Sequence, residues 1–191
     1  NTFQRMKTIN QTTIKKEVSL HGVGLHTGQN VTLTFKPAPV NNGYAFKRID
    51  LEGEPIIPAD ANLVTNTDRG TSLEKNGVVI QTSEHVLAAC VGLGIDNVIL
   101  ELNASEPPIM DGSSKYFVEA LEKAGVEELD APRDEFIVED VISFKDEESG
   151  SEIIVMPSNE YQVTTMVDFG TKVLGTQNAY LNTMSDFKTE I

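Results

Sequence analysis

The chain has 191 residues, of which 39% are hydrophobic, and a formal net charge of −14 from 15 basic and 29 acidic side chains. This length and hydrophobic content suffice for a buried core in one domain or two small ones. The charge is not offset by a basic patch, and no run approaches the roughly 18 apolar residues of a membrane span, so we expect neither a nucleic-acid-binding nor an integral membrane protein.

Glycine and proline divide the first part of the chain into short segments whose patterns are typical of strands. These segments are residues 12–20, 30–39, 43–50 and 77–82. In the second segment Val31, Leu33 and Phe35 alternate with more polar residues. This period of two predicts a strand with one buried face.

Residues 83–91 are apolar on nearly every side after their first turn, which predicts a buried helix. Thr82 is its predicted N-cap, and Gly92 or Gly94 its end. The helix carries Cys90, the single cysteine of the chain, so no internal disulfide can form. A lone cysteine in an apolar run is typical of a buried side chain in a reducing compartment, and we therefore expect a cytoplasmic protein.

A strand is predicted next, over residues 95–102, and an amphipathic helix follows within residues 110–125. The acidic segment 127–135, which contains a proline, is predicted to link two units. The expected units are residues 1–129 and 130–191.

The second unit repeats the order of the first, with strands followed by a helix. Strand-like patterns cover residues 135–144, 151–158 and 161–170. The helix is predicted over 184–191 with Asn182 or Thr183 as its cap, and its apolar side chains are Met184, Phe187 and Ile191. Because this apolar stripe is still running at Ile191, we expect the second unit to be incomplete in this chain.

The main candidate site is the adjacent pair Glu84 and His85 at the start of the predicted helix. Their side chains stand about 100 degrees apart around the axis and can face one cleft. The positive end of the helix dipole disfavours imidazolium and favours a carboxylate, which suits His85 as a metal ligand and Glu84 as a general base. The alternative is a surface pair that only complements the dipole, and spacing alone favours it.

The other histidines, His21 and His26, lie beside or within the glycine-rich segment 22–28. Together with His85 they are an alternative zinc site, which needs three protein ligands and an open position for water. We favour an exposed His21 and a His26 that holds the backbone of a turn. The glycines match neither a dinucleotide fingerprint nor a Walker motif, and predict a tight turn.

Two further polar segments have structural interpretations. Asp111 precedes a Gly-Ser-Ser turn and is predicted, with the serines, to cap the following helix, although a catalytic carboxylate is the alternative. Residues 65–73 carry Arg69 and predict a surface loop.

Four stretches, in their order and separation, resemble the UDP-3-O-acyl-N-acetylglucosamine deacetylases of lipid A biosynthesis. They are TIKKEVSL (13–20), GVGLHTG (22–28), TSEHVLAACVGLGIDN (82–97) and PIMDGSS (108–114). The resemblance implies hydrolysis of an N-acetyl group with Glu84 as general base and His85 as one ligand of a catalytic Zn²⁺. The implied products are acetate and a free 2-amino sugar nucleotide.

The resemblance also implies two similar α+β units, each a sheet layered with helices (ribosomal S5 domain 2-like), packed face to face with zinc between them. Loop 65–73 would then border the cleft that binds the UDP-linked acylated glucosamine substrate. The loop residues expected to approach this substrate are Asp68, Arg69, Gly70 and Thr71. No ligand role carries over to His26 or Asp111.

The family takes its other two zinc ligands from a late His-Lys-x-x-x-Asp segment, which this sequence lacks. We therefore expect the chain to be the N-terminal portion of the enzyme, inactive alone and a weak zinc binder. The alternative is a non-catalytic module that binds a sugar nucleotide or a protein. Some family members resemble fusions with a 3-hydroxyacyl-carrier-protein dehydratase, and residues 46–57 look closest to those.

Overall fold

The fold is described by a computed structural model from residue 9 to residue 190. The chain divides into two units, one ending at Arg133 and the other spanning Asp134–Glu190. Both combine strands with few helices, so the fold is α+β, as predicted. No helix in this described range is both long and apolar enough to cross a membrane.

The main sheet of the first unit has five strands in the order β2-β3-β9-β4-β5. Their bounds are Val18–Val23 for β2, Asn30–Pro37 for β3, Val98–Leu102 for β9, Tyr44–Arg48 for β4 and Ile56–Pro58 for β5. Strand β4 runs parallel to β9, and the other neighbours are antiparallel. The predicted face of β3 is confirmed, because Val31, Leu33 and Phe35 are all buried.

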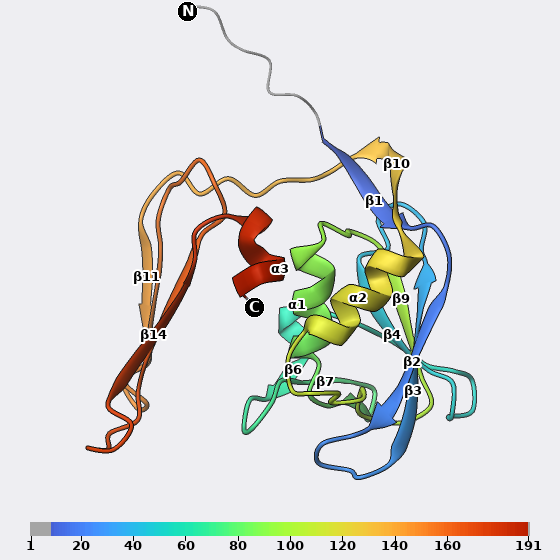
Figure 1. Cartoon of the computed structure of the whole chain (residues 1–191), viewed down its shortest axis with the longest axis horizontal. Coiled ribbons are helices and arrows are strands. Elements are labelled where there is room, and N and C mark those ends of the chain that lie inside the picture. Colours follow the sequence, from blue (N-terminus) through green and yellow to red (C-terminus); the bar gives the residue numbers. More distant parts are fainter. Residues whose placement is uncertain (1–8, 191) are drawn as a thin grey trace, which may run out of the picture. The chain divides into compact units, whose positions relative to one another are not determined.

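Helices α1 (Glu84–Gly92) and α2 (Lys115–Ala124) lie side by side against this sheet (Figure 1). The rings of Phe35 on β3 and Phe117 on α2 meet edge to face, with centroids 6.5 Å apart. This contact anchors α2, while α1 buries Cys90 as predicted. Helix α1 is less enclosed than predicted, because Val91 is 44% exposed.

A small sheet directly precedes α1 in the chain. It consists of β6 (Val64–Asn66), β7 (Ser72–Lys75) and β8 (Val78–Ile80), and η1 (Ala61–Leu63) precedes it. Because β6 and β7 pair antiparallel, the residues between them form a turn. Strand β8 ends four residues before α1, and the turn contacts the helix start through the Thr71 amide, which donates to Glu84.

Two sequence predictions are corrected by strand pairing. The predicted strand 12–20 is broken at residues 15–17 into β1 (Asn10–Ile14) and β2, because β1 leaves the main sheet to pair with β10 (Val126–Pro132). Most of the predicted linker 127–135 is therefore strand, although the two units do divide within it, after Arg133. Arg133 itself is held by Asp96, with Nη2 2.9 Å from Oδ2.

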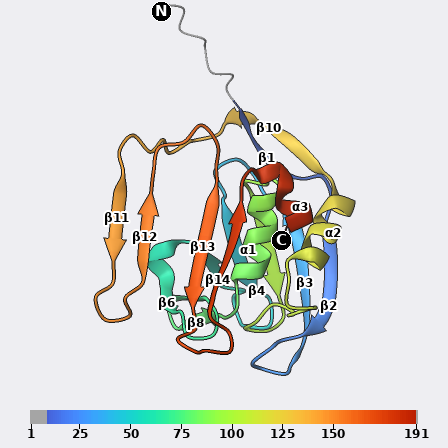
Figure 2. The same ribbon diagram turned by 60° about the vertical axis from the view of Figure 1, so that its left-hand side comes forward.

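The second unit contains two antiparallel hairpins (Figure 2). They pair β11 (Ile142–Lys145) with β12 (Glu152–Val155), and β13 (Val163–Asp168) with β14 (Thr176–Leu181). Strand β14 was not predicted, and the predicted strand 135–144 is a strand only from Ile142.

The C-terminal helix begins as η2 (Met184–Asp186) and continues as α3 (Phe187–Glu190). Thr183 is its N-cap, as predicted, and its side chain accepts a hydrogen bond from the Ser185 amide. The last residue of the predicted apolar stripe, Ile191, lies outside the described residues.

Limited digestion with a protease that cleaves after glutamate tests where the units divide. We expect the first cuts after Glu135 and Glu139, which lie outside regular structure, because a protease needs unpaired extended backbone. Cuts after Glu127 and Glu128 should come later, because both residues pair with β1. Mass spectrometry of the early fragments decides between the two orders, and early cleavage after Glu128 would contradict the pairing of β10 with β1.

Candidate active site

Glu84 and His85 are the first two residues of α1. His85 Nε2 lies 3.9 Å from Glu84 Oε1, and the two side chains are 31% and 38% exposed, respectively. The predicted N-cap is wrong by one residue, because Ser83 occupies that position. Its hydroxyl makes no capping bond and instead donates to the Thr71 carbonyl at 3.0 Å. Both candidate side chains therefore lie next to each other at the N-terminal end of the helix, where they are partly exposed to solvent.

The turn between β6 and β7 holds the Glu84 carboxylate. The Thr71 amide donates to Glu84 Oε2 at 2.9 Å, and the Ser83 amide donates to the Thr71 carbonyl at 3.2 Å. A Cβ on Gly70 would lie 3.4 Å from Glu84 Oε1, so this glycine is also adjacent. Asp68 and Arg69 are exposed in the same turn. The loop thus borders Glu84, and its contact with substrate stays a prediction.

Thr82 makes the sharp change of direction between β8 and α1. Its φ is 50°, a left-handed conformation that β-branched residues rarely adopt, and its side chain is buried. The hydroxyl donates to Glu106 Oε1 at 2.7 Å. Thr82 therefore does not cap the helix as predicted: it lies one residue before the N-cap position, and its hydroxyl contacts Glu106 and His26 instead of a helix amide.

Glu106 is fully buried and was not predicted as part of the site. Besides the Thr82 hydroxyl, it accepts hydrogen bonds from the Thr27 amide and hydroxyl and from the His26 amide, and His26 Nδ1 lies 2.9 Å from Oε1. Burial desolvates the carboxylate and opposes its ionisation, but these hydrogen bonds outweigh burial and lower the pKa of Glu106 to about 2. The buried group is therefore a carboxylate anion.

The glycines of segment 22–28 let the backbone wrap closely around this anion. A Cβ on Gly24 would lie only 2.6 Å from Glu106 Oε2. Gly28 has a φ of 64° and closes the predicted tight turn with a bond from its amide to the Gly24 carbonyl. The signal that marks Glu106 in the sequence is an acidic residue directly before two prolines, four residues after the end of the buried strand β9.

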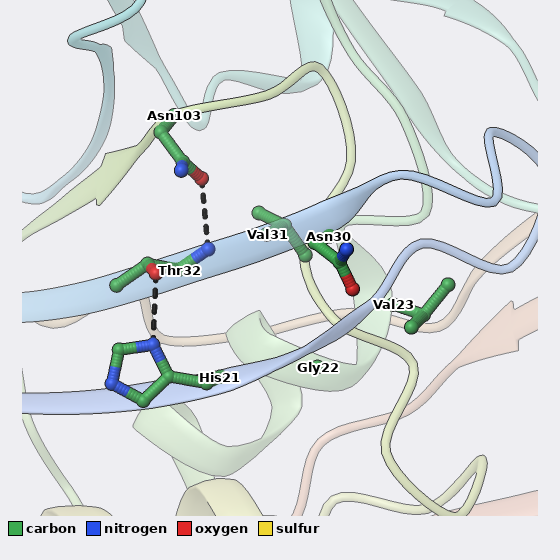
Figure 3. A pocket seen from close by; sticks show the side chains of 7 residues that line it. All are labelled: His21, Gly22, Val23, Asn30, Val31, Thr32 and Asn103. Atoms are coloured by element: carbon green, nitrogen blue, oxygen red, sulfur yellow. Dashed lines mark hydrogen bonds between the residues drawn. The ribbon is translucent and has the colours of Figure 1, made fainter.

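The three-histidine zinc site is not formed. His21 is exposed, as predicted, and its Nδ1 lies 2.8 Å from Thr32 Oγ1 in a hollow of about 380 Å³ over β2 and β3 (Figure 3). The His26 ring contacts Glu106 and not turn backbone, which corrects that prediction. In the described part of the chain, no three His, Cys, Asp or Glu side chains come together to hold a metal.

Segment 108–114 reaches α1 through a serine hydroxyl. Asp111 accepts hydrogen bonds from the Ser113 hydroxyl and amide, which lower the pKa of Asp111 and close the turn before α2. Ser114 follows as the N-cap residue, and its hydroxyl donates to the His85 carbonyl at 2.9 Å. The predicted cap is thus confirmed only in position: a serine, Ser114, is the N-cap residue, but its hydroxyl makes no capping bond and Asp111 closes the preceding turn instead. Ser114 ties that turn to the His85 backbone.

His85 fits one position of a zinc site. Its imidazole is partly exposed beside a carboxylate. Its nearest polar side-chain partner among the described residues is this Glu84 carboxylate, at 3.9 Å. A catalytic zinc needs three protein ligands. The described residues supply one imidazole with a neighbouring carboxylate, and not a complete ligand set.

Comparison with known proteins gives a consistent match. Residues 11–191 match the family model described as UDP-3-O-acyl N-acetylglycosamine deacetylase (LpxC). The bifunctional enzyme LpxC/FabZ of Bacteroides thetaiotaomicron is 46% identical over 183 residues, which cover 96% of this chain and 40% of that protein. UDP-3-O-acyl-N-acetylglucosamine deacetylases of Chromohalobacter salexigens and Myxococcus xanthus are 43% and 39% identical, over 88% and 98% of this chain. The chain spans 55% and 59% of their lengths.

The Glu106→Gln substitution tests the buried anion, because it keeps the size of the side chain and removes its charge. The pKa of Glu106 is lowered from 4.5 to about 2, so the carboxylate stabilises the fold fully above about pH 5, and this contribution is lost as the pH falls through about 2. The difference in free energy of unfolding between the wild type and the variant should therefore be largest near neutral pH and shrink in acid.

Urea unfolding across this pH range measures the difference. The matched control is Glu127→Gln, an exposed position on β10, which should change the free energy of unfolding little at any pH. A difference for Glu106→Gln that stays constant down to about pH 2 would contradict the ionised state.

Proposed function

The chain belongs to the UDP-3-O-acyl N-acetylglycosamine deacetylase family, and we propose that it provides the general base and one metal ligand of a zinc-dependent amidohydrolase. The substrate of this proposal is UDP-3-O-acyl-N-acetylglucosamine, an intermediate of lipid A biosynthesis, from which the N-acetyl group is removed. The observation that carries the proposal is the Glu84 carboxylate, held by the Thr71 amide beside the His85 ring at the open end of α1.

Glu84 is suited to accept a proton from an attacking water. Its Oε2 accepts a hydrogen bond from the Thr71 amide at 2.9 Å, and its Oε1 lies 3.9 Å from His85 Nε2. Anchoring one oxygen orients the other, so the carboxylate can take the proton of the water and return it to the leaving amine.

His85 would hold the zinc ion through its imidazole, together with ligands that residues 9–190 do not bring to its side. When bound, zinc lowers the pKa of the water that it coordinates and polarises an amide carbonyl. The proposal therefore includes that this chain alone lacks deacetylase activity. Ser114 supports the ligand role by fixing the His85 backbone through its carbonyl.

The proposal extends to the turn beside Glu84. Gly70 and Thr71 lie next to the carboxylate, and Asp68 and Arg69 are exposed in the same turn. This placement supports substrate contacts from residues 68–71. An exposed arginine beside a general base is suited to a negatively charged nucleotide substrate.

Two broader features belong to the same proposal. The second unit repeats strands followed by a helix, which supports two similar layered α+β units of the ribosomal S5 domain 2-like type. A single cysteine, buried and unpaired at Cys90, supports a cytoplasmic location.

Substitutions of the pair, made in the complete natural protein that contains these residues, test the proposal. Glu84→Gln keeps the shape and removes the base, so kcat for acetate release should fall roughly 10²- to 10⁴-fold with zinc content unchanged. His85→Ala removes a ligand, so zinc affinity and activity should fall together. Acetate release from the acylated sugar nucleotide and zinc per chain are the measurements.

The control Glu127→Gln, on exposed β10, should leave both quantities unchanged. The assigned roles are wrong if Glu84→Gln loses its zinc or if His85→Ala keeps both metal and rate. A complete protein that binds the sugar nucleotide without releasing acetate would favour the non-catalytic module.

A further inference from the structure

We propose that Glu106 is a positioning residue, whose buried carboxylate fixes the start of α1 through Thr82 and so orients Glu84 and His85. The inference rests on the proposed function for the roles of Glu84 and His85. The geometry that carries it is a continuous series of contacts from the buried carboxylate to the proposed base.

The first contact holds a residue in an unfavourable backbone conformation. Thr82 has a φ of 50°, a left-handed conformation that is unfavourable for a β-branched residue. Its hydroxyl donates to Glu106 Oε1 at 2.7 Å, and this bond to an anion opposes relaxation of the backbone. A Thr82 that relaxed to extended backbone would change the direction in which the chain enters α1.

The next contacts connect Thr82 to the base. The residue after it, Ser83, donates from both its amide and its hydroxyl to the Thr71 carbonyl. The Thr71 amide in turn donates to Glu84 Oε2 at 2.9 Å. A shift of Thr82 would therefore move Ser83, disturb Thr71 and release the Glu84 carboxylate.

The chemistry of Glu106 favours a positioning role over a purely stabilising one. Its side chain is completely buried, and among the described residues no lysine or arginine pairs with it. Its partners are backbone amides, two threonine hydroxyls and the His26 ring. A buried anion costs desolvation energy that an apolar side chain would not, but its two oxygens can accept from several donors at once in a fixed arrangement.

The experiment compares Thr82→Val, Thr82→Ser and Glu106→Gln in the complete natural protein. Valine keeps the branched shape and removes the hydroxyl, whereas serine keeps the hydroxyl. We expect Thr82→Val and Glu106→Gln to lower kcat roughly 10- to 100-fold with KM little changed, because a displaced base slows chemistry more than binding. Thr82→Ser should retain most of the wild-type kcat.

The matched control is Thr13→Val. Thr13 is also buried, and its hydroxyl donates to the Asn97 carbonyl at 2.8 Å and accepts from the Ala38 amide at 3.0 Å. Its loss should lower the free energy of unfolding without changing kcat.

Amide hydrogen exchange at Thr71 provides a readout that does not depend on activity. Exchange should accelerate in Thr82→Val and Glu106→Gln toward the rate in Glu84→Ala, which lacks the accepting carboxylate. Equal Thr71 exchange in the wild type and Thr82→Val would overturn the proposal, as would variants that lose thermal stability but keep kcat. If the wild-type protein releases no acetate, the proposed function fails, and Thr71 exchange still decides the positioning role.

Discussion

The buried carboxylate of Glu106 is the interaction on which the arrangement of the candidate site depends. It accepts hydrogen bonds both from the turn at residues 24–28 and from Thr82, the residue that leads into α1. Two other segments reach the same helix start, with Thr71 on the Glu84 carboxylate and Ser114 on the His85 carbonyl. A helix start that would otherwise fray is thereby fixed by three segments that are distant in sequence.

The energetics of this region balance costs against specific hydrogen bonds. Burial opposes ionisation of Glu106, yet its donors lower the pKa to about 2, so the bonds outweigh desolvation. Gly24 allows the close approach, because a side chain there would overlap the carboxylate. Thr82 stores backbone strain at the junction. Strain and buried charge concentrated beside a proposed base are typical of functional sites.

Local patterns in the sequence predicted much of the fold correctly. The alternation of Val31, Leu33 and Phe35 identified the buried face of β3, a nearly continuous apolar run identified α1, and an amphipathic pattern identified α2. The errors came from pairing between distant residues. The acidic segment at 127–132 has no strong strand pattern, and becomes β10 only because β1, more than a hundred residues earlier, offers it a partner.

The sequence by itself determined the α+β class and the family, and it placed Glu84 and His85 next to each other as the candidate pair, because periodicity and short motifs are local properties of the chain. Only the tertiary structure decided that Thr82 turns away from the helix it was predicted to cap, and that His26 and Glu106 form one buried cluster. The physical reason is that a hydrogen bond depends on distance in space. Glu106 lies 80 residues after His26 in the chain, and no local pattern encodes that contact.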